Sequence, residues 1–412
     1  MNESCYLDAN ATQPLRPAAR DAVLAAFEVI GNPSSVHQSG RGARRIMEDA
    51  REVIAHLFGG RPQDLVFTSG GTEADSTAIH AMSRERRVIT SAIEHDAVRS
   101  MVADGVARER ADGVARERAD GIAPERADSF AVPVRADGVV DLAALDQRLS
   151  DGVASLVCLM LANNETGVIQ PVPEAATICR RHGALLHVDA VQAAGRMPVR
   201  LDLLGAHSLA ISSHKLGGPA GVGALLLAPD APFAGPLIGG GGQERGRRGG
   251  TPAVALIAGF AAAALASETD DLICLARLRD AAERAAVACG AIVCGDPDRR
   301  LPNTTCIALP GAAAGVQVIA LDLEKIAVSA GAACSSGKVQ TSHVLLAMGL
   351  GPLAAQAIRV SLPWNVTPAD IDAFATAYRR MAARLCPNLR PQRVPPAHAH
   401  WPRAPSDPNS ER

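Results

Sequence analysis

One lysine stands where a reactive amine is expected. The chain of 412 residues contains only three lysines, Lys215, Lys325 and Lys338. Lys215 ends the run Ser212-Ser213-His214-Lys215, which follows a short apolar stretch at residues 208–211 and precedes the turn-forming Leu216-Gly217-Gly218-Pro219. Loops at strand ends are where α/β enzymes carry reactive groups. We therefore expect Lys215 to form a Schiff base, the linkage by which pyridoxal phosphate is held.

Other polar residues could hold the remaining parts of that cofactor. Asp189 follows the apolar run 184–188, and its carboxylate would keep the pyridine nitrogen protonated so that the ring accepts electrons. Small residues at 68–73 precede a helix-like stretch at 74–82, where free N–H groups suit a phosphate; a plain tight turn would use the same residues. The candidates for the phosphate are Gly71, Thr72, Ser212 and His214, and those for the ring oxygen are Asn164 and Gln192.

The elements that carry these residues alternate in type. Residues 65–67, 156–161 and 184–188 have the length and apolarity of strands, and the run at 156–161 suits a strand buried on both faces. Residues 41–58 and 173–182 have helical spacing, and Thr367 followed by Pro368 predicts the start of a helix at 369–385. We expect an α/β fold with a large, mostly parallel sheet and a smaller α/β C-terminal domain.

The domain boundaries follow from the same pattern. We expect a large cofactor-binding domain at 14–255, a small domain at 1–13 and 256–386, and a disordered Pro-rich tail at 387–412. Residues 103–128 contain three copies of an octad that begins Ala-Asp-Gly, a period far too short for a solenoid repeat. We interpret it as a surface insertion, in which a glycine in every copy opposes a stable helix.

Composition excludes several classes of function. The net charge of -2 gives no cationic excess for nucleic acid or a membrane surface, and no apolar stretch reaches the length of a membrane span. Nine cysteines without a Cys-x-x-Cys pair or zinc-like clustering indicate reduced thiols and no metal site. The N-terminus has neither a basic nor an apolar signal region, so we expect a cytoplasmic protein.

Seven stretches together resemble a known family. They are Asn32-Pro33-Ser34-Ser35-Val36-His37, Phe67-Thr68-Ser69-Gly70-Gly71-Thr72-Glu73, Glu94-His95, Asn163-Asn164-Glu165, His187-Val188-Asp189-Ala190-Val191-Gln192, Ser213-His214-Lys215 and Gly242-Gln243-Glu244-Arg245-Gly246. With them the chain resembles the cysteine desulfurases of the class V aminotransferase group, which have the type I fold of pyridoxal phosphate enzymes. The resemblance covers residues 6–385, apart from the octads.

The resemblance implies a role for each matching residue. Lys215 is the Schiff-base lysine, His95 stacks on the ring and moves protons, and Asp189 pairs with the ring nitrogen. The implied phosphate ligands are Thr72, Ser212, His214 and, from the other subunit of a homodimer, Thr251. Arg359 would clamp the substrate carboxylate, helped by Asn32. Cys334, in a stretch of small residues, matches the family's sulfur-accepting cysteine.

The implied reaction takes sulfur from L-cysteine, leaving L-alanine and a persulfide on Cys334 for an acceptor protein of iron-sulfur cluster assembly or of tRNA or cofactor thiolation. A selenocysteine lyase or another class V enzyme would share Lys215 and Asp189, and a non-catalytic sulfur-relay scaffold would share the fold. The chain departs from the family pattern at six positions, which are Gly217, Ala220, Ala330, Ala332, Pro363 and Trp364. These departures bear on rate, substrate preference and the acceptor surface.

Overall fold

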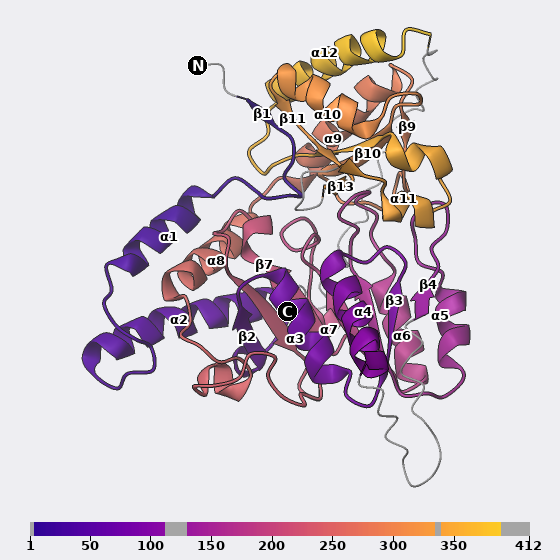
Figure 1. Ribbon diagram of the computed structural model, residues 1–412. Coiled ribbons are helices and arrows are strands. Elements are labelled where there is room, and N and C mark those ends of the chain that lie inside the picture. Colours follow the sequence, from indigo (N-terminus) through magenta and orange to yellow (C-terminus); the bar gives the residue numbers. More distant parts are fainter. Residues whose placement is uncertain (1–3, 112–129, 334–338, 389–412) are drawn as a thin grey trace, which may run out of the picture.

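Two sheets of different size organise the protein. The computed structural model describes residues 4–111, 130–333 and 339–388. The larger sheet has seven strands in the order β2-β8-β7-β6-β5-β3-β4, and the smaller one has four in the order β12-β15-β10-β9 (Figure 1). The strands of the larger sheet are β2 (Leu65–Thr68), β3 (Arg87–Ser91), β4 (Phe130–Val132), β5 (Ser155–Met160), β6 (Leu185–Asp189), β7 (Ser208–Ser212) and β8 (Gly223–Leu227). Those of the smaller sheet are β9 (Ile292–Val293), β10 (Thr304–Ala308), β12 (Ser329–Ala330) and β15 (Ala357–Ser361).

The larger sheet is mostly parallel, as predicted. Strands β4, β3, β5, β6 and β7 run in one direction, whereas β8 is antiparallel to both β7 and β2. Every residue of β5 is buried, because helices cover both faces of a parallel sheet. The carboxyl ends of β5, β6 and β7 meet at one edge of the sheet, where α/β folds bind their ligands.

Helices cover this sheet in neighbouring groups. Helices α1 and α2 both pack against α8, α3 packs on α4, and α5 packs on α6. Thr367 and Asp370 form a capping box at the start of α12, which confirms the predicted helix start. The α-helices are α1 (Pro17–Phe27), α2 (Gln38–Leu57), α3 (Gly71–Met82), α4 (Asp96–Ala111), α5 (Leu142–Leu149), α6 (Val172–Arg181), α7 (Leu201–Leu204), α8 (Val254–Ser267), α9 (Leu272–Val287), α10 (Ala314–Leu323), α11 (His343–Ala347) and α12 (Pro368–Leu385). The 3₁₀ helices are η1 (Pro62–Asp64), η2 (Ser213–Lys215), η3 (Gln243–Gly246) and η4 (Gly351–Ala355).

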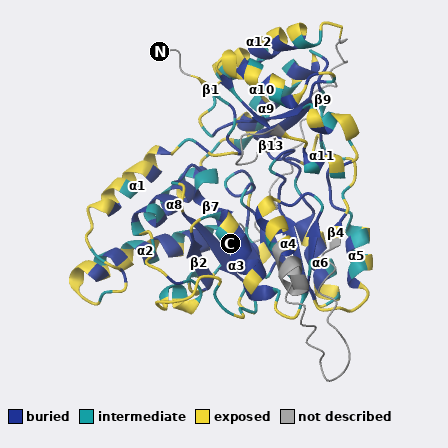
Figure 2. Ribbon diagram, viewed as in Figure 1, coloured by how far each residue is buried: buried dark blue, intermediate teal, exposed yellow. Residues whose placement is uncertain are grey.

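Each of the two sheets has its own hydrophobic core (Figure 2). The core of the larger sheet includes Phe67, Leu186 and, from α8, Phe260. The core of the smaller sheet includes Ile358 of β15 and Phe374 of α12. The predicted domain boundaries, including the one at residue 255, stay a prediction. Helix α8 contributes to the core of the larger sheet.

An N-terminal strap, residues 7–13, joins the two sheets. It follows β1 (Cys5–Tyr6), which pairs in parallel with β11 (Ile326–Ala327). The strap hydrogen-bonds the smaller sheet through Ala9 N and Ser361 O (2.9 Å), and it hydrogen-bonds the loop after β7 through Gln13 N and His214 O (3.0 Å). The sequence predicted only a short extended segment here.

Two of the predicted special segments lie mostly outside the described residues. The first octad continues α4, which reaches Ala111, although its glycine was expected to oppose a stable helix. The preceding turns of α4 extend the helix through this glycine, which costs about 1 kcal/mol relative to alanine. Residues 112–129 and 389–412 are not described, which leaves the rest of the insertion and most of the tail untested. Within the described residues, no helix combines the length and the apolarity needed to cross a membrane.

Candidate active site

A cavity of about 240 Å³ lies at the carboxyl edge of the larger sheet. It brings together all the predicted cofactor-binding residues except Thr251. Its lining residues are Gly71, Thr72, Asp75, His95, Met160, Ala162, Asn164, Asp189, Val191, Gln192, Ser212, His214 and Lys215. They come from the ends of β5, β6 and β7, from the first turn of α3 and from the loop after β3, because these termini share one edge of the sheet.

Lys215 projects its amine into this cavity from η2, directly after β7. Its Nζ donates hydrogen bonds to the backbone oxygens of Asn10 and of Ala11, the latter at 2.9 Å. Burial, and then the nearby charges of Arg359 and Arg196, lower the pKa of Lys215 to about 7. A large share of the amine is therefore neutral near pH 7, which is the nucleophilic form that a Schiff base requires.

Asp189 ends β6 and is buried in the cavity wall. Burial raises the pKa of its carboxyl, against the opposing effects of the Val191 N–H, which donates at 2.8 Å, and of the charges of His95 and Lys215. Asp75 lies in the same wall, and its Oδ1 is 3.1 Å from Nε2 of His187. Burial lowers the pKa of His187 to about 3, so this imidazole is neutral. Among the described residues, Asp189 forms no ion pair.

The opposite part of the cavity suits an anion. Thr72 lies in the first turn of α3, a helix of 12 residues whose N-terminal N–H groups have no acceptor within the helix. Gly71 packs so closely that a Cβ atom there would lie 2.6 Å from Cγ2 of Val191. Burial, followed by the charges of Lys215 and Arg196, lowers the pKa of His214 to about 4, so its neutral ring can donate one hydrogen bond.

His95 lies at the mouth of the cavity, after β3. Its Nδ1 accepts a hydrogen bond from the Ala97 N–H at 3.1 Å, so the proton of the neutral ring is on Nε2. Glu94 lies behind it and is fully buried. Burial raises the pKa of Glu94 to about 8, and this carboxyl therefore adds little negative charge at neutral pH.

These observations fit pyridoxal phosphate. A protonated pyridine nitrogen would give the buried Asp189 the cationic partner that it lacks, and the first turn of α3 would receive the phosphate. Oδ1 of Asn164 is buried at the cavity without a hydrogen-bond partner among the described residues, although buried polar atoms are normally paired. A donor on a bound molecule would satisfy it. Lys215, Asp189 and Asn164 would hold the aldehyde carbon, the ring nitrogen and a polar substituent or the substrate.

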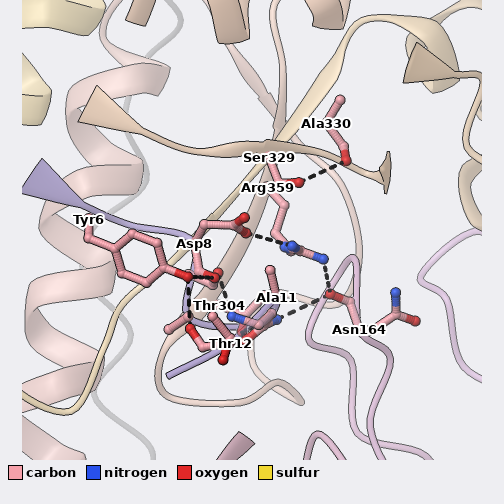
Figure 3. A network of polar contacts seen from close by, with 12 residues as sticks. Tyr6, Asp8, Ala11, Thr12, Asn164, Thr304, Ser329, Ala330 and Arg359 are labelled. Carbon is pink, nitrogen blue, oxygen red and sulfur yellow. Dashed lines mark hydrogen bonds and ion pairs between the residues drawn. The ribbon is translucent and has the colours of Figure 1, made fainter. Parts of the chain in front are cut away.

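The predicted substrate ligands lie outside the cavity lining. Arg359, on β15, is buried and donates to the backbone oxygen of Asn164 (3.1 Å) and to Oδ1 of Asp8 (2.6 Å) (Figure 3). Arg359 is not part of the cavity lining, but it hydrogen-bonds Asn164, which is. Asn32 is exposed, and its Oδ1 accepts from the Ser34 N–H at 2.9 Å. The structure does not bring Asn32 to the cavity.

Two more predicted residues lie elsewhere. Thr251 lines a separate cavity of about 110 Å³ beside Ser69 and Arg248. Its position is compatible with a role in another subunit, which stays a prediction. Cys334 lies outside the described residues, in the segment between Ala333 of β13 (Ala332–Ala333) and Val339 of β14 (Val339–Gln340). Among the described residues, no three His, Cys, Asp or Glu side chains gather in a way that could hold a metal ion.

Two of the residues that depart from the family pattern, Gly217 and Trp364, both lie beside Arg16. Gly217 has φ of +84°, and a Cβ atom there would lie 2.8 Å from Cγ of Arg16, so this backbone has no room for an aromatic side chain. The guanidinium of Arg16 instead stacks on the ring of Trp364 at 4.9 Å, and the indole N–H donates to Pro14 O at 2.9 Å. Trp364 therefore supplies an aromatic group next to the position where Gly217 has none.

Sequence reasoning missed Asp8, Asn10 and Arg196. Asn10 is buried, its backbone oxygen accepts from Lys215 and Gln192, and its side-chain N–H donates to Asn164 O at 3.1 Å. Arg196 donates to Gln192 and to Ala9 O. The sequence does contain a signal for Asp8 and Asn10. They alternate with apolar residues in an extended segment, a pattern that places both side chains on the same face.

Comparison with known proteins gives the family. A profile described as aminotransferase class V matches residues 5–114 and 122–374. The chain is 43% identical to a cysteine desulfurase from Cereibacter sphaeroides, covering 90% of this chain and 93% of that protein. It is 38% identical to the cysteine desulfurase NifS from Azotobacter vinelandii, covering 92% and 93%.

The fold gives the same result. The solved structure of a NifS-like protein has a TM-score of 0.82 at 33% identity, covering 93% of this chain and 100% of that one. A NifS-like protein from Rickettsia africae has a TM-score of 0.80 at 32% identity, covering 92% and 99%. The predicted α/β class and type I fold are confirmed. The chain belongs to the class V aminotransferase family and, within it, to the pyridoxal phosphate-dependent cysteine desulfurases.

Proposed function

We propose that this protein takes sulfur from L-cysteine, releases L-alanine and keeps the sulfur as a persulfide on Cys334. The observation that supports it most is the convergence of Lys215, Asp189 and His95 in one cavity of a chain that belongs to the cysteine desulfurases. Each has the residue type that the chemistry needs.

The proposed mechanism divides the work among the chain's own residues. Bound pyridoxal phosphate supplies a sink for the electron pair left on the substrate Cα. Asp189 keeps the proton on the ring nitrogen, and Arg359 binds the substrate carboxylate. Lys215 is free once the substrate amine has taken its place, and its amine removes the Cα proton. His95 can exchange a proton with the substrate through Nε2, which carries the hydrogen of the neutral ring.

Sulfur transfer then needs a nucleophile. The thiolate of Cys334 attacks the substrate sulfur, an S–S bond forms, and the electrons of the Cβ–S bond return to carbon, which takes up a proton. One L-cysteine and one enzyme thiol thus give one L-alanine and one persulfide, without an added oxidant.

The test of this function uses the purified holoenzyme and its Cys334→Ala variant. The wild-type protein should release alanine from L-cysteine and carry an additional sulfur on the peptide that contains Cys334, measured by mass spectrometry. The variant should keep the cofactor absorbance but form neither product. Full alanine release by the variant contradicts the assignment of the nucleophile. A keto acid in place of alanine identifies a transaminase, and a preference for selenocysteine identifies a selenocysteine lyase.

We further propose that the chain works as a homodimer. Large apolar side chains are exposed on α1 and on the segment that joins it to α2. Figure 2 colours much of both as exposed. The side chains are Leu24, Phe27, Val29, Ile30 and Val36, of which Ile30 and Val36 are each 86% exposed. Exposed apolar groups in this number are typical of interaction surfaces. A second copy of this chain would cover them and bring Thr251 toward the neighbouring cavity.

The acceptor and the compartment are proposed from chemistry. A persulfide needs a thiol or cluster-assembling acceptor protein, of iron-sulfur assembly or of a thiolation relay. The cysteines of the described residues are all free thiols, and one of them, Cys274, is exposed. Free thiols persist in a reducing compartment, which supports a cytoplasmic location.

A further inference from the structure

We propose that Asp8 is a positioning residue for substrate recognition. It holds the guanidinium of Arg359 in the orientation that receives the substrate carboxylate, and it thereby sets the affinity for carboxylate-bearing substrates. This inference depends on the proposed role of Arg359. No motif in the sequence pointed to Asp8, which lies 351 residues from its partner.

The guanidinium of Arg359 is held at two of its nitrogens (Figure 3). Nη2 donates to Oδ1 of Asp8 at 2.6 Å, and Nη1 donates to Asn164 O at 3.1 Å. The side chains of Arg359 and Asp8 are 6% and 20% exposed. The guanidinium has five N–H donors, and Nε is buried without a partner among the described residues. Donors therefore remain for a second carboxylate while Asp8 stays in place.

Asp8 is fixed by contacts of its own backbone. Its carbonyl oxygen accepts hydrogen bonds from the Tyr6 hydroxyl and from the Ala11 N–H, both at 2.9 Å. It also forms a parallel bridge with Ser361, two residues beyond Arg359 on β15. The carboxylate and the guanidinium thus project from two backbone segments that are bonded to each other. This is a rigid support, not a contact between two mobile side chains.

Charge explains why a support is needed. After burial, the charge of Arg359 contributes to lowering the pKa of Arg196 and of Lys215, whereas the charge of Asp8 raises the pKa of Lys215. Without the Asp8 carboxylate, repulsion would favour conformations in which Arg359 turns away from Lys215. The amine and the guanidinium must both face the substrate, since the amine removes the Cα proton and the guanidinium binds the carboxylate.

The kinetic test compares Asp8→Ala and Asp8→Asn in the holoenzyme. A lost hydrogen bond to a charged group should raise the KM for L-cysteine by about tenfold or more in Asp8→Ala, with kcat changed by less than about threefold. Asp8→Asn keeps an acceptor oxygen and should show a smaller rise. In an Arg359→Ala background, Asp8→Ala should add no further rise, because Asp8 acts through Arg359.

A binding measurement separates positioning from a general structural effect. The cofactor absorbance of the holoenzyme reports the binding of L-alanine, which has a carboxylate, and of cysteamine, which has none. Asp8→Ala should weaken L-alanine by about tenfold and leave cysteamine unchanged. The matched control is Glu324→Ala, which removes an exposed carboxylate paired with Arg380 and should change neither.

Three results would overturn the inference. They are a KM that falls in Asp8→Ala, equal weakening of both ligands, and an undiminished effect of Asp8→Ala in the Arg359→Ala background. A wild-type enzyme that releases no alanine from L-cysteine is a different result, because it removes the proposed function itself. The L-alanine and cysteamine titrations still test Asp8 in that case.

Discussion

At the scale of single residues, the site uses burial to prepare its ionisable groups. Lys215, His187 and His214 lose proton affinity, whereas Asp75, Asp189 and Glu94 gain it. In each group the leading cause is the cost of keeping a charge away from water. Near pH 7 the imidazoles of His187 and His214 are therefore neutral and a large share of the amine is neutral, and Asp189 is left to be ionised by a cationic partner.

The pKa of Lys215 predicts how fast the cofactor-free protein takes up pyridoxal phosphate. Only the neutral amine reacts, and its fraction rises with pH through the pKa of about 7. The uptake rate, followed by absorbance, should therefore rise between about pH 6 and pH 8 and then level off. A rate that is still rising tenfold per pH unit above pH 9 would show an ordinary lysine and contradict the prediction.

The residues of the site were predictable to different degrees. Lys215 and Asp189 each follow a strand of the larger sheet, so their convergence follows from the alternation of strands and helices. Asp8 and Asn10 have ordinary residue types and act through contacts with residues far along the chain, such as Asn164 and Arg359. No local pattern encodes such contacts, and only the folded chain shows them.

At the scale of elements, the glycine-rich loop 239–250 is tied to the phosphate side of the cavity by two ion pairs. Glu244 forms a bidentate pair with Arg51 of α2 and accepts from the Phe67 N–H of β2. Arg248 pairs with Glu73, in the first turn of α3. Glycine density correctly predicted a loop, but it gave no sign of these ties, which depend on tertiary packing.

Breaking the first tie should be costly. The side chains of Glu244 and Arg51 are 2% and 4% exposed, so Glu244→Ala leaves a buried cation without its main partner. We expect a loss of about 3–5 kcal/mol in the free energy of unfolding. Residue 244 has a left-handed backbone with φ of +48° in the wild-type protein, and any relief of that backbone strain in the variant would make the loss smaller. Chemical denaturation measures this loss.

An exposed pair provides the control for this measurement. Arg20 and Asp21 are 59% and 64% exposed, so Arg20→Ala should change the free energy of unfolding by less than about 1 kcal/mol. Equal losses in the free energy of unfolding for Glu244→Ala and Arg20→Ala would contradict this prediction, because the buried Arg51–Glu244 pair would then stabilise the fold no more than an exposed pair.

At the scale of the whole molecule, the exposed apolar face around α1 predicts self-association. Phe27, Ile30 and Val36 would lose contact with water in a dimer, and each fully buried side chain of this size contributes about 1.5–3 kcal/mol. We expect sedimentation or light scattering to give twice the mass of the chain. The variant Phe27→Asp with Ile30→Asp should shift it toward the monomer.

The matched control for this double variant lies on another surface. Ile319 and Leu323 of α10 are 64% and 75% exposed, and their replacement by Asp should leave the mass unchanged. A monomeric wild-type protein with full activity would contradict both the dimer and the proposed role of Thr251.

The strap between the two sheets has a consequence for how the protein is made. Arg359 leaves the ribosome 351 residues after Asp8, yet the two must meet to complete the proposed clamp. The entropy cost of closing a loop grows only slowly with its length, so a contact between residues this far apart in the chain can still form. A growing or truncated chain that lacks β15 has Lys215 but no clamp, and it therefore should not commit cysteine to desulfuration. Release of reactive sulfur is thereby reserved for finished molecules.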